Sequence, residues 1–426
     1  MIRCGDKYRS HLGPTGATAV AMLTAVILAG SACAQSGPPI KIGYSMSLTG
    51  GLAPNGKSAL LAQRIWEGDT NAKGGMLGRP VKLVYYDDKS SPSEIPAIYT
   101  KLLDIDKVDL IIGAYGTALT APAMPIVIQR KKTFIGLLAL AVNSQFNYPN
   151  YFVMIPSGPD AKSAFTKGFF DVAVRQDPKP QSVAIVAADQ EFSRNAADGA
   201  RENTRQNGLK LVYERTYPPA TADFAPIVRA ITAANPDLVV VCSYPPDSVG
   251  MVRAVNELGF KPKALGGAMV GLQSTAIKAQ LGPLLNGFIN YEFWLPVPKM
   301  QFPGVADLIS RYQARAASEG VDPLGYYMPP WAYAQLQVLQ QAVEGTKTLD
   351  DAKLGDYIRV HPFTTVAGEV RFGADGEWAQ SRVLQVQYQN IKGQDIAQFK
   401  DMSTQVVVAP PQYASGEVIY PYERAK

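Results

Sequence analysis

Short apolar runs alternate with helix-period stretches along most of the chain. The first apolar runs cover residues 40–46 and 81–86, and a Gly-containing loop and a helical pattern follow the first of them. The same alternation restarts after Pro156, with apolar runs at residues 182–188 and 236–243. Strands that alternate with helices of this length are typical of βαβ units, whose parallel sheets are covered on both faces. The pattern therefore predicts an α/β protein with two lobes.

The last third of the chain has a different pattern. It predicts three helices, then a Gly-punctuated hairpin and one further strand, at residues 305–317, 332–344, 350–360, 368–378 and 383–389. The end of the chain contains the runs A-P-P and Y-P-Y, and proline is unfavourable inside helices and central strands. Residues 394–426 are therefore expected to form an irregular C-terminal strap.

The amino terminus has the pattern of an export signal. Three basic residues lie within the first 16, and residues 17–32 form an uncharged, Ala-rich stretch that ends in Ala32-Cys33-Ala34. This stretch is shorter than the roughly 20 apolar residues that a membrane span needs. A lipoprotein signal is the weaker alternative, because Gly30 stands where such a signal has Leu. The sequence thus predicts a signal peptide at 1–34 and a mature chain in the periplasm.

Composition excludes several classes of protein. The 426 residues include 41 bases and 36 acids, for a net charge of +5 without a basic cluster, so no nucleic-acid partner is expected. The two cysteines and the histidine of the first 34 residues leave with the signal, so that Cys242 and His361 are the only residues of these types that remain. An internal disulfide, a Cys/His metal site and a Ser-His-Asp triad are therefore not expected. The sequence predicts a monomeric protein with no catalytic residues, no metal and no cofactor.

One motif favours a different function. Residues 51–58 match G-x-x-x-x-G-K-[ST], and they stand between a predicted strand and a predicted helix, as a phosphate-binding loop would. A nucleotide-binding enzyme is therefore an alternative. The export signal and the lack of a convincing strand that ends in a magnesium-binding Asp argue against it.

Residues 40–92 resemble the leucine/isoleucine/valine-binding proteins of bacterial ABC importers. The resemblance rests on I-K-I-G, on N-G-K-S, on the run N-A-K-G-G-M-L-G-R-P-V-K-L-V-Y-Y-D-D, and on V-D-L-I-I-G further along the chain. It implies a type I periplasmic binding fold: two Rossmann-like lobes with parallel central sheets, three hinge crossings, and a small-molecule ligand in the cleft between the lobes. It also implies the membrane permease subunits of the importer as partners. A ligand-sensing receptor or regulator of the same fold is a further alternative.

The resemblance also implies a division of the chain into lobes. The crossings are expected near Pro156, near Ile289 and between Val366 and Leu384. Lobe 1 would then comprise residues 35–156 and 289–365, and lobe 2 residues 157–288 and 366–393.

The resemblance places the ligand's carboxylate at Thr117. This residue begins a predicted helix, and a helix N-terminus with a hydroxyl is a favourable seat for an anion. A simple helix cap remains the alternative for Thr117, and core packing remains the alternative for the aromatic positions. The expected ligand-binding residues are Tyr115, Gly116, Thr117, Leu140, Ala141, Val142, Phe192, Tyr244 and Ala268.

Two of these positions depart from the family pattern. Val142 replaces a Thr, and Ala268 falls where the family has the Glu that binds the ligand's ammonium group. No Asp or Glu occurs in residues 138–146 or 261–273, and Asp247 is the only nearby candidate for that role. The favoured alternative for Asp247 is a cap of the predicted helix that begins at Ser248. A buried ammonium without a counter-charge costs several kcal/mol. The sequence therefore favours a small hydrophobic or aromatic carboxylate, and keeps amino acids within the expected range.

Overall fold

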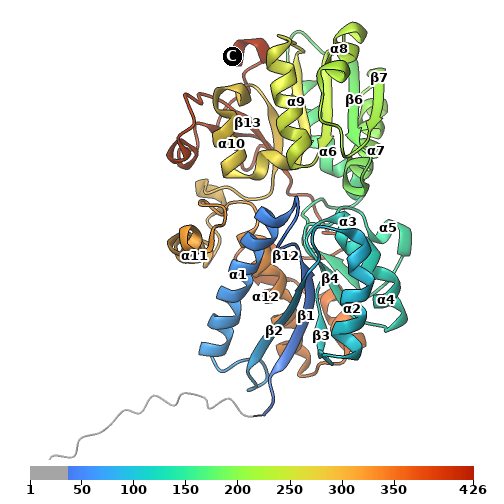
Figure 1. Cartoon of the computed structure of the whole chain (residues 1–426), viewed down its shortest axis with the longest axis vertical. Coiled ribbons are helices and arrows are strands. Elements are labelled where there is room, and N and C mark those ends of the chain that lie inside the picture. The colour runs from blue at the N-terminus through green and yellow to red at the C-terminus, as the bar shows by residue number, and fades with distance from the viewer. Residues whose placement is uncertain (1–36) are drawn as a thin grey trace, which may run out of the picture.

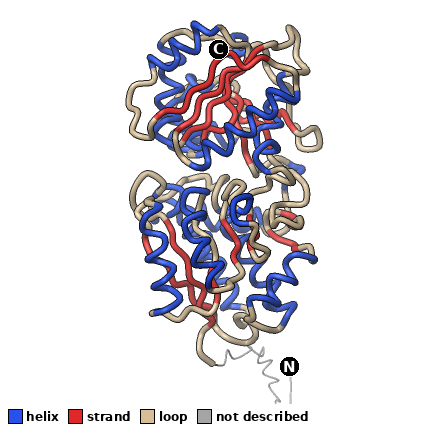
Figure 2. The backbone as a smooth tube through the Cα atoms, turned by 90° about the vertical axis from the view of Figure 1, so that its right-hand side faces the viewer, coloured by secondary structure: helices blue, strands red, loops and turns tan. Residues whose placement is uncertain are grey.

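The computed structural model describes residues 37–426 and shows two lobes stacked along the long axis of the molecule (Figure 1). The predicted signal peptide, residues 1–34, lies outside the described residues. Each lobe has strands in its interior and helices around them (Figure 2). No helix of the described chain combines the length and the hydropathy that a membrane crossing requires.

The first five strands of lobe 1 run parallel within two groups, β2-β1-β3 and β4-β5. The Gly113 amide donates to the Ile135 carbonyl at 2.8 Å, which joins the two groups of strands. The strands are β1 (Ile40–Met46), β2 (Val81–Asp87), β3 (Leu110–Ile111), β4 (Phe134–Gly136) and β5 (Tyr151–Val153). The helices are α1 (Ala53–Ala72), α2 (Ile95–Asp104), α3 (Thr117–Thr120), α4 (Met124–Gln129), α5 (Asn143–Phe146), α11 (Val305–Glu319), α12 (Pro329–Thr346) and α13 (Asp351–Val360).

Lobe 2 contains one seven-stranded sheet in the order β14-β13-β10-β9-β8-β6-β7. The five strands from β10 to β7 in this order are parallel. β13 runs antiparallel to β10, and β14 runs antiparallel to β13. The strands are β6 (Ser182–Ala188), β7 (Lys210–Tyr217), β8 (Leu238–Ser243), β9 (Ala264–Met269), β10 (Ile289–Glu292), β13 (Leu384–Tyr388) and β14 (Gln405–Ala409). The helices are α6 (Ala161–Ala173), α7 (Glu191–Gln206), α8 (Ala225–Ala234), α9 (Pro245–Glu257) and α10 (Thr275–Leu281). All six residues of β8 are buried, as expected for a strand covered on both faces.

The second crossing lies a few residues after Ile289, and the third lies inside the expected region between Val366 and Leu384. β10 belongs to the sheet of lobe 2, because Ile289 pairs with Gly266 of β9, so the chain crosses after Glu292. The hairpin of β11 (Phe363–Thr365) and β12 (Gly368–Val370) stays with lobe 1, where β11 packs against α12. The chain returns to lobe 2 near Arg382, whose amide donates to the Pro156 carbonyl at 2.8 Å. An apolar run predicts a strand but does not indicate which sheet it joins, so the predicted lobe boundaries at residues 289 and 366 fall before the observed crossings.

The C-terminal segment is not an irregular strap throughout. β14 pairs antiparallel with β13 and forms the edge of the lobe 2 sheet. Residues 410–426 then continue without a further strand. The prolines that suggested a strap, Pro410, Pro411 and Pro421, all come after the last residue of β14. They are therefore compatible with a strand at this position.

The edge strand supplies a direct test of this correction. Val407 is fully buried, and its neighbour Val408 is partly exposed. We expect Val407→Ala to lower the free energy of unfolding by about 2 kcal/mol, because it leaves a cavity in the core. Val408→Ala is the matched control and should cost less than about 0.5 kcal/mol. Urea unfolding measures both, and equal effects would contradict the placement of β14.

Candidate ligand-binding site

The two lobes meet around a small cavity with a volume of about 20 Å³. This is roughly the space that one water molecule occupies. Five of the predicted site residues line it, namely Tyr115, Gly116, Thr117, Phe192 and Tyr244. Lobe 1 contributes the first three, and lobe 2 contributes the other two from the starts of α7 and α9. The structure thus brings together residues that lie up to 129 positions apart in the sequence.

Thr117 begins α3, directly after Gly116, whose φ of +86° favours glycine. The hydroxyl oxygen of Thr117 accepts a hydrogen bond from the Leu140 amide at 2.9 Å. Within residues 37–426 the proton of this hydroxyl has no acceptor at hydrogen-bond distance. The first amides of a helix also lack partners inside the helix. Thr117 can therefore donate its proton to a ligand that carries negative charge.

Four predicted residues do not line the cavity. Leu140, Ala141 and Val142 are buried behind it, and Leu138 is the member of this segment that faces the cavity. The Leu140 carbonyl accepts a hydrogen bond from Asn195 Nδ2 of α7 at 3.0 Å, which joins the two lobes. Ala268 is buried inside β9, and Val270 lines the cavity two residues later. A ligand contact by these four residues stays a prediction.

The sequence interpretation missed several wall residues of lobe 2 and of the crossings. Tyr291 lies on β10, Phe293 follows it, and Ile155 precedes the first crossing. Hydrophobic periodicity does not show which sheet β10 joins, and only its place in the sheet of lobe 2 puts Tyr291 and Phe293 between the lobes. Tyr327, from the loop before α12, also lines the cavity.

The cavity has aromatic walls. Phe192 packs edge-on against Tyr244 at 5.9 Å, Tyr115 packs edge-on against Tyr327 at 6.3 Å, and Phe293 stacks on Tyr327 at 6.0 Å, all measured between ring centroids. No charged side chain of the described residues lines this cavity. Such walls favour an apolar or aromatic ligand body, whose charge must be met at the polar end of the site.

Charged groups lie in a neighbouring pocket of about 420 Å³, which shares Tyr244 with the cavity. Asp189, Glu191, Arg194 and Asp247 line this pocket. Burial raises the pKa of Asp247 to about 6. Asp247 lies in the first turn of α9, which begins at Pro245, so it does not precede the helix as a cap residue would. Residues 261–273 around Ala268 include no acid, and the acidic side chains of this pocket instead lie on or beside α7 and α9.

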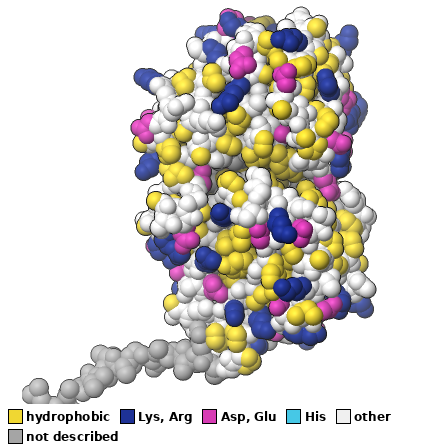
Figure 3. All heavy atoms as spheres, in the orientation of Figure 1, with side chains coloured by type: hydrophobic (Ala, Val, Ile, Leu, Met, Phe, Trp, Pro, Cys, Tyr) yellow, Lys and Arg dark blue, Asp and Glu magenta, His cyan; other side chains and the backbone are white. Residues whose placement is uncertain are grey.

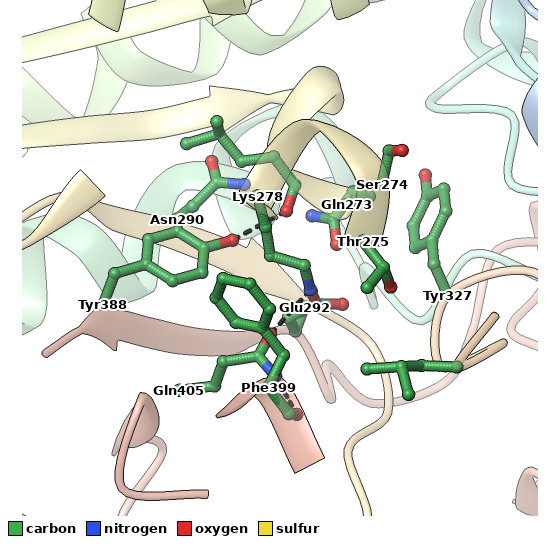
Figure 4. Close-up of polar contacts among 12 residues, drawn as sticks. Gln273, Ser274, Thr275, Lys278, Asn290, Glu292, Tyr327, Tyr388, Phe399 and Gln405 are labelled. Carbon is green, nitrogen blue, oxygen red and sulfur yellow. Dashed lines mark hydrogen bonds and ion pairs between the residues drawn. The ribbon is translucent and has the colours of Figure 1, made fainter. Parts of the chain in front are cut away.

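A third pocket, of about 300 Å³, lies between the first turn of α1, the start of α10 and the loop before α12, and it shares Tyr327 with the cavity. A buried network lies beside this pocket (Figure 4). Lys278 Nζ donates to Gln405 Oε1 at 2.6 Å and lies 4.0 Å from Glu292 Oε1. Burial raises the pKa of Glu292 and lowers that of Lys278. This pair ties α10 and β14 to the end of β10, where the chain crosses to lobe 1.

The structure contradicts the phosphate-loop interpretation of residues 51–58. Helix α1 begins at Ala53, so that Gly56, Lys57 and Ser58 lie inside it. The Gly56 amide donates to the Leu52 carbonyl at 2.9 Å and is not free for a phosphate. A Cβ at Gly56 would lie 2.0 Å from the Ser47 carbonyl oxygen. Close packing of α1 against the end of β1 therefore explains this glycine.

Basic and acidic side chains intermingle on both lobes of the face shown in Figure 3. In residues 37–426, no group of three or more His, Cys, Asp or Glu side chains has the arrangement of a metal site.

Comparisons with known proteins agree with this geometry. The family profile described as "Periplasmic binding protein" matches residues 39–394. An amino acid binding protein of Pseudomonas aeruginosa is 25% identical over 332 residues, which cover 76% of this chain and 84% of that protein. The leucine-binding protein of Thermotoga maritima has a similar structure, with a TM-score of 0.71 at 19% identity over 82% of this chain and 96% of that one. A solute-binding protein of an ABC transporter from Rhodopseudomonas palustris, solved in complex with 3,4-dihydroxybenzoic acid, also has a similar structure. Its TM-score is 0.69 at 17% identity, and the match covers 84% of this chain and 94% of that one.

One buried acid near the site leads to a pH prediction. Glu377 is 4% exposed, Ser157 Oγ donates to it at 3.3 Å, and burial raises its pKa to about 8. The folded protein therefore binds more protons than the unfolded chain between about pH 4.5 and pH 8. Stability should fall as the pH rises through this window, and Glu377→Gln should reduce the fall.

Urea unfolding at pH 5.5, 7 and 8.5 measures this effect. Glu369→Gln, at an exposed position of β12, is the matched control and should follow the wild type. The same pH dependence in the wild type and in Glu377→Gln would contradict the prediction.

Proposed function

The chain belongs to the periplasmic binding protein family, and on this basis we propose that it is the solute-binding component of an ABC importer. Its ligand is a small hydrophobic or aromatic carboxylate, or an amino acid, held between the two lobes. The family consists of solute-binding proteins and implies a location outside the cytoplasm. We propose that residues 1–34 are the export signal and that the importer's permease subunits are the partners.

The hydroxyl of Thr117 is the observation that carries this proposal. It faces the cavity between the lobes, and its oxygen is already occupied by the Leu140 amide. A ligand carboxylate accepts one hydrogen bond from this hydroxyl and others from the nearby backbone amides at the start of α3. Leu140 and Asn195 then link this anion seat to lobe 2 through one hydrogen bond at 3.0 Å.

The walls support a ligand with an apolar or aromatic body. Phe192, Tyr244 and Phe293 offer rings to it, and Leu138 and Val270 offer aliphatic surface. A cavity of 20 Å³ is too small for such a body, so the lobes open to admit it and close around it. The ligands of the structural relatives, leucine and 3,4-dihydroxybenzoic acid, both carry a carboxylate.

A thermal-shift panel identifies the ligand class. It comprises amino acids, aryl carboxylates, 2-oxo acids, amides, and ATP with magnesium. A ligand at 100 times its dissociation constant should add about 2.7 kcal/mol of stability. A shift with at least one carboxylate is expected, and a shift with ATP alone would contradict the proposal.

Replacement of Thr117 tests the anion seat. Thr117→Val keeps the shape of the side chain and removes its hydroxyl, so the carboxylate loses a charge-assisted hydrogen bond. We expect the dissociation constant of the best ligand to rise about 10- to 100-fold in calorimetry. Thr117→Ser restores a hydroxyl and should bind within about threefold of the wild type. Equal affinities of the Val variant and the wild type would place the carboxylate elsewhere.

A further inference from the structure

Three phenol groups meet in the cavity between the lobes. They belong to Tyr115, Tyr291 and Tyr327, which we call the phenol cluster. The hydroxyl of Tyr327 lies 3.5 Å from that of Tyr115 and 3.3 Å from that of Tyr291. Asn55 Nδ2, from the first turn of α1, donates to the Tyr115 hydroxyl at 2.7 Å. The cluster thus joins three separate segments of lobe 1 to β10 of lobe 2.

The hydrogen-bonding capacity of the phenol cluster is not fully used. A phenol can donate one hydrogen bond and accept others, and O–H···O bonds are usually 2.7–2.8 Å long. Both contacts inside the cluster are much longer than this. Among residues 37–426, the Tyr327 hydroxyl has no polar partner besides these two. The cluster can therefore form stronger hydrogen bonds with a polar group that enters the cavity.

The phenol cluster is electrically neutral. Burial raises the pKa of Tyr115 to about 12, and it raises the pKa values of Tyr291 and Tyr327 well above their usual range. Neutral phenols can donate to and accept from a hydroxyl group. They provide no counter-charge for an ammonium group.

The surroundings of the phenol cluster are apolar. Phe293 stacks on the ring of Tyr327, and Leu138 and Ile155 complete the nearby wall. A ligand that fills the cavity with carbon alone would leave the phenol groups with poor partners in a dry site, which costs affinity. A ligand with a matching hydroxyl avoids this cost.

We propose that the phenol cluster recognises a hydroxyl group of the ligand, so that the preferred ligand is a hydroxylated aromatic carboxylate. The inference rests on the proposed function, because it assumes that the carboxylate of the same ligand lies at Thr117. It assigns two recognition elements to one cavity: a charged group meets the start of α3, and a neutral hydroxyl meets the phenol cluster.

Calorimetry with benzoate, 3-hydroxybenzoate and 4-hydroxybenzoate tests the inference on the full chain without its signal. We expect at least one hydroxybenzoate to bind about tenfold or more tightly than benzoate. Tyr327→Phe removes one hydroxyl and keeps the ring, so it should reduce this preference to within about twofold. Tyr115→Phe provides an independent second variant with the same expected result.

Tyr326→Phe is the matched control. Tyr326 is the neighbour of Tyr327 in the same loop, packs edge-on against Trp294 at 5.7 Å, and is not part of the cavity wall. This variant should keep the preference of the wild type. Thermal unfolding of each variant shows whether it is folded before its binding is measured.

The outcomes separate the inference from the proposed function. If the wild type binds benzoate and both hydroxybenzoates equally, or binds only amino acids, the inference is wrong and the proposed function stands. If folded Tyr327→Phe and Tyr115→Phe both keep the full preference, the phenol cluster is not the recognition element. If no carboxylate or amino acid binds, the proposed function itself fails.

Discussion

One hydrogen bond sets the direction in which the Thr117 hydroxyl can donate between the lobes. The Leu140 amide donates to Thr117 Oγ1 at 2.9 Å, and this fixes the hydroxyl of Thr117 as a donor at the interface of the lobes. The oxygen cannot readily accept from a second group, and its proton needs an acceptor. The position of Thr117 at the start of α3 adds the positive end of a helical turn. An anionic ligand can accept a hydrogen bond from the Thr117 hydroxyl and interact with the positive end of this turn. The other walls then contact the uncharged part of the ligand.

Among the described residues, no charged side chain lines the cavity beside Thr117, whose walls are apolar, aromatic or phenolic. The charged side chains of α7 and α9 line the adjoining pocket, which shares Leu52, Ala118, Leu119 and Tyr244 with the cavity. A low-dielectric site strengthens the hydrogen bonds to a bound carboxylate. Contacts between the lobes, such as Asn195 with Leu140 and Tyr291 with Tyr327, form only when the lobes are together. We therefore propose that ligand binding and lobe closure depend on the same residues.

The sequence predicted the α/β class, the two lobes and five of the fourteen residues that line the cavity. Thr117, Phe192 and Tyr244 could be found because the resemblance to the leucine/isoleucine/valine-binding proteins implied them, and each stands at or near the start of a helix. Tyr291 and Phe293 could not, because hydrophobic periodicity does not show which sheet β10 joins. Leu140 and Ala268 illustrate the same limit on a smaller scale, since a shift of two residues along a segment separates a buried position from a wall position. The motif at residues 51–58 was misleading because Gly56 serves close helix packing.

A crystal structure of the wild-type protein with its tightest-binding carboxylate tests the central claim most directly. The account predicts one ligand between the lobes, with a carboxylate oxygen about 3 Å from Thr117 Oγ1 and its apolar body against Phe192, Tyr244 and Phe293. A ligand whose carboxylate instead lies beside Arg194 in the neighbouring pocket, with Thr117 making no contact to it, would contradict the account.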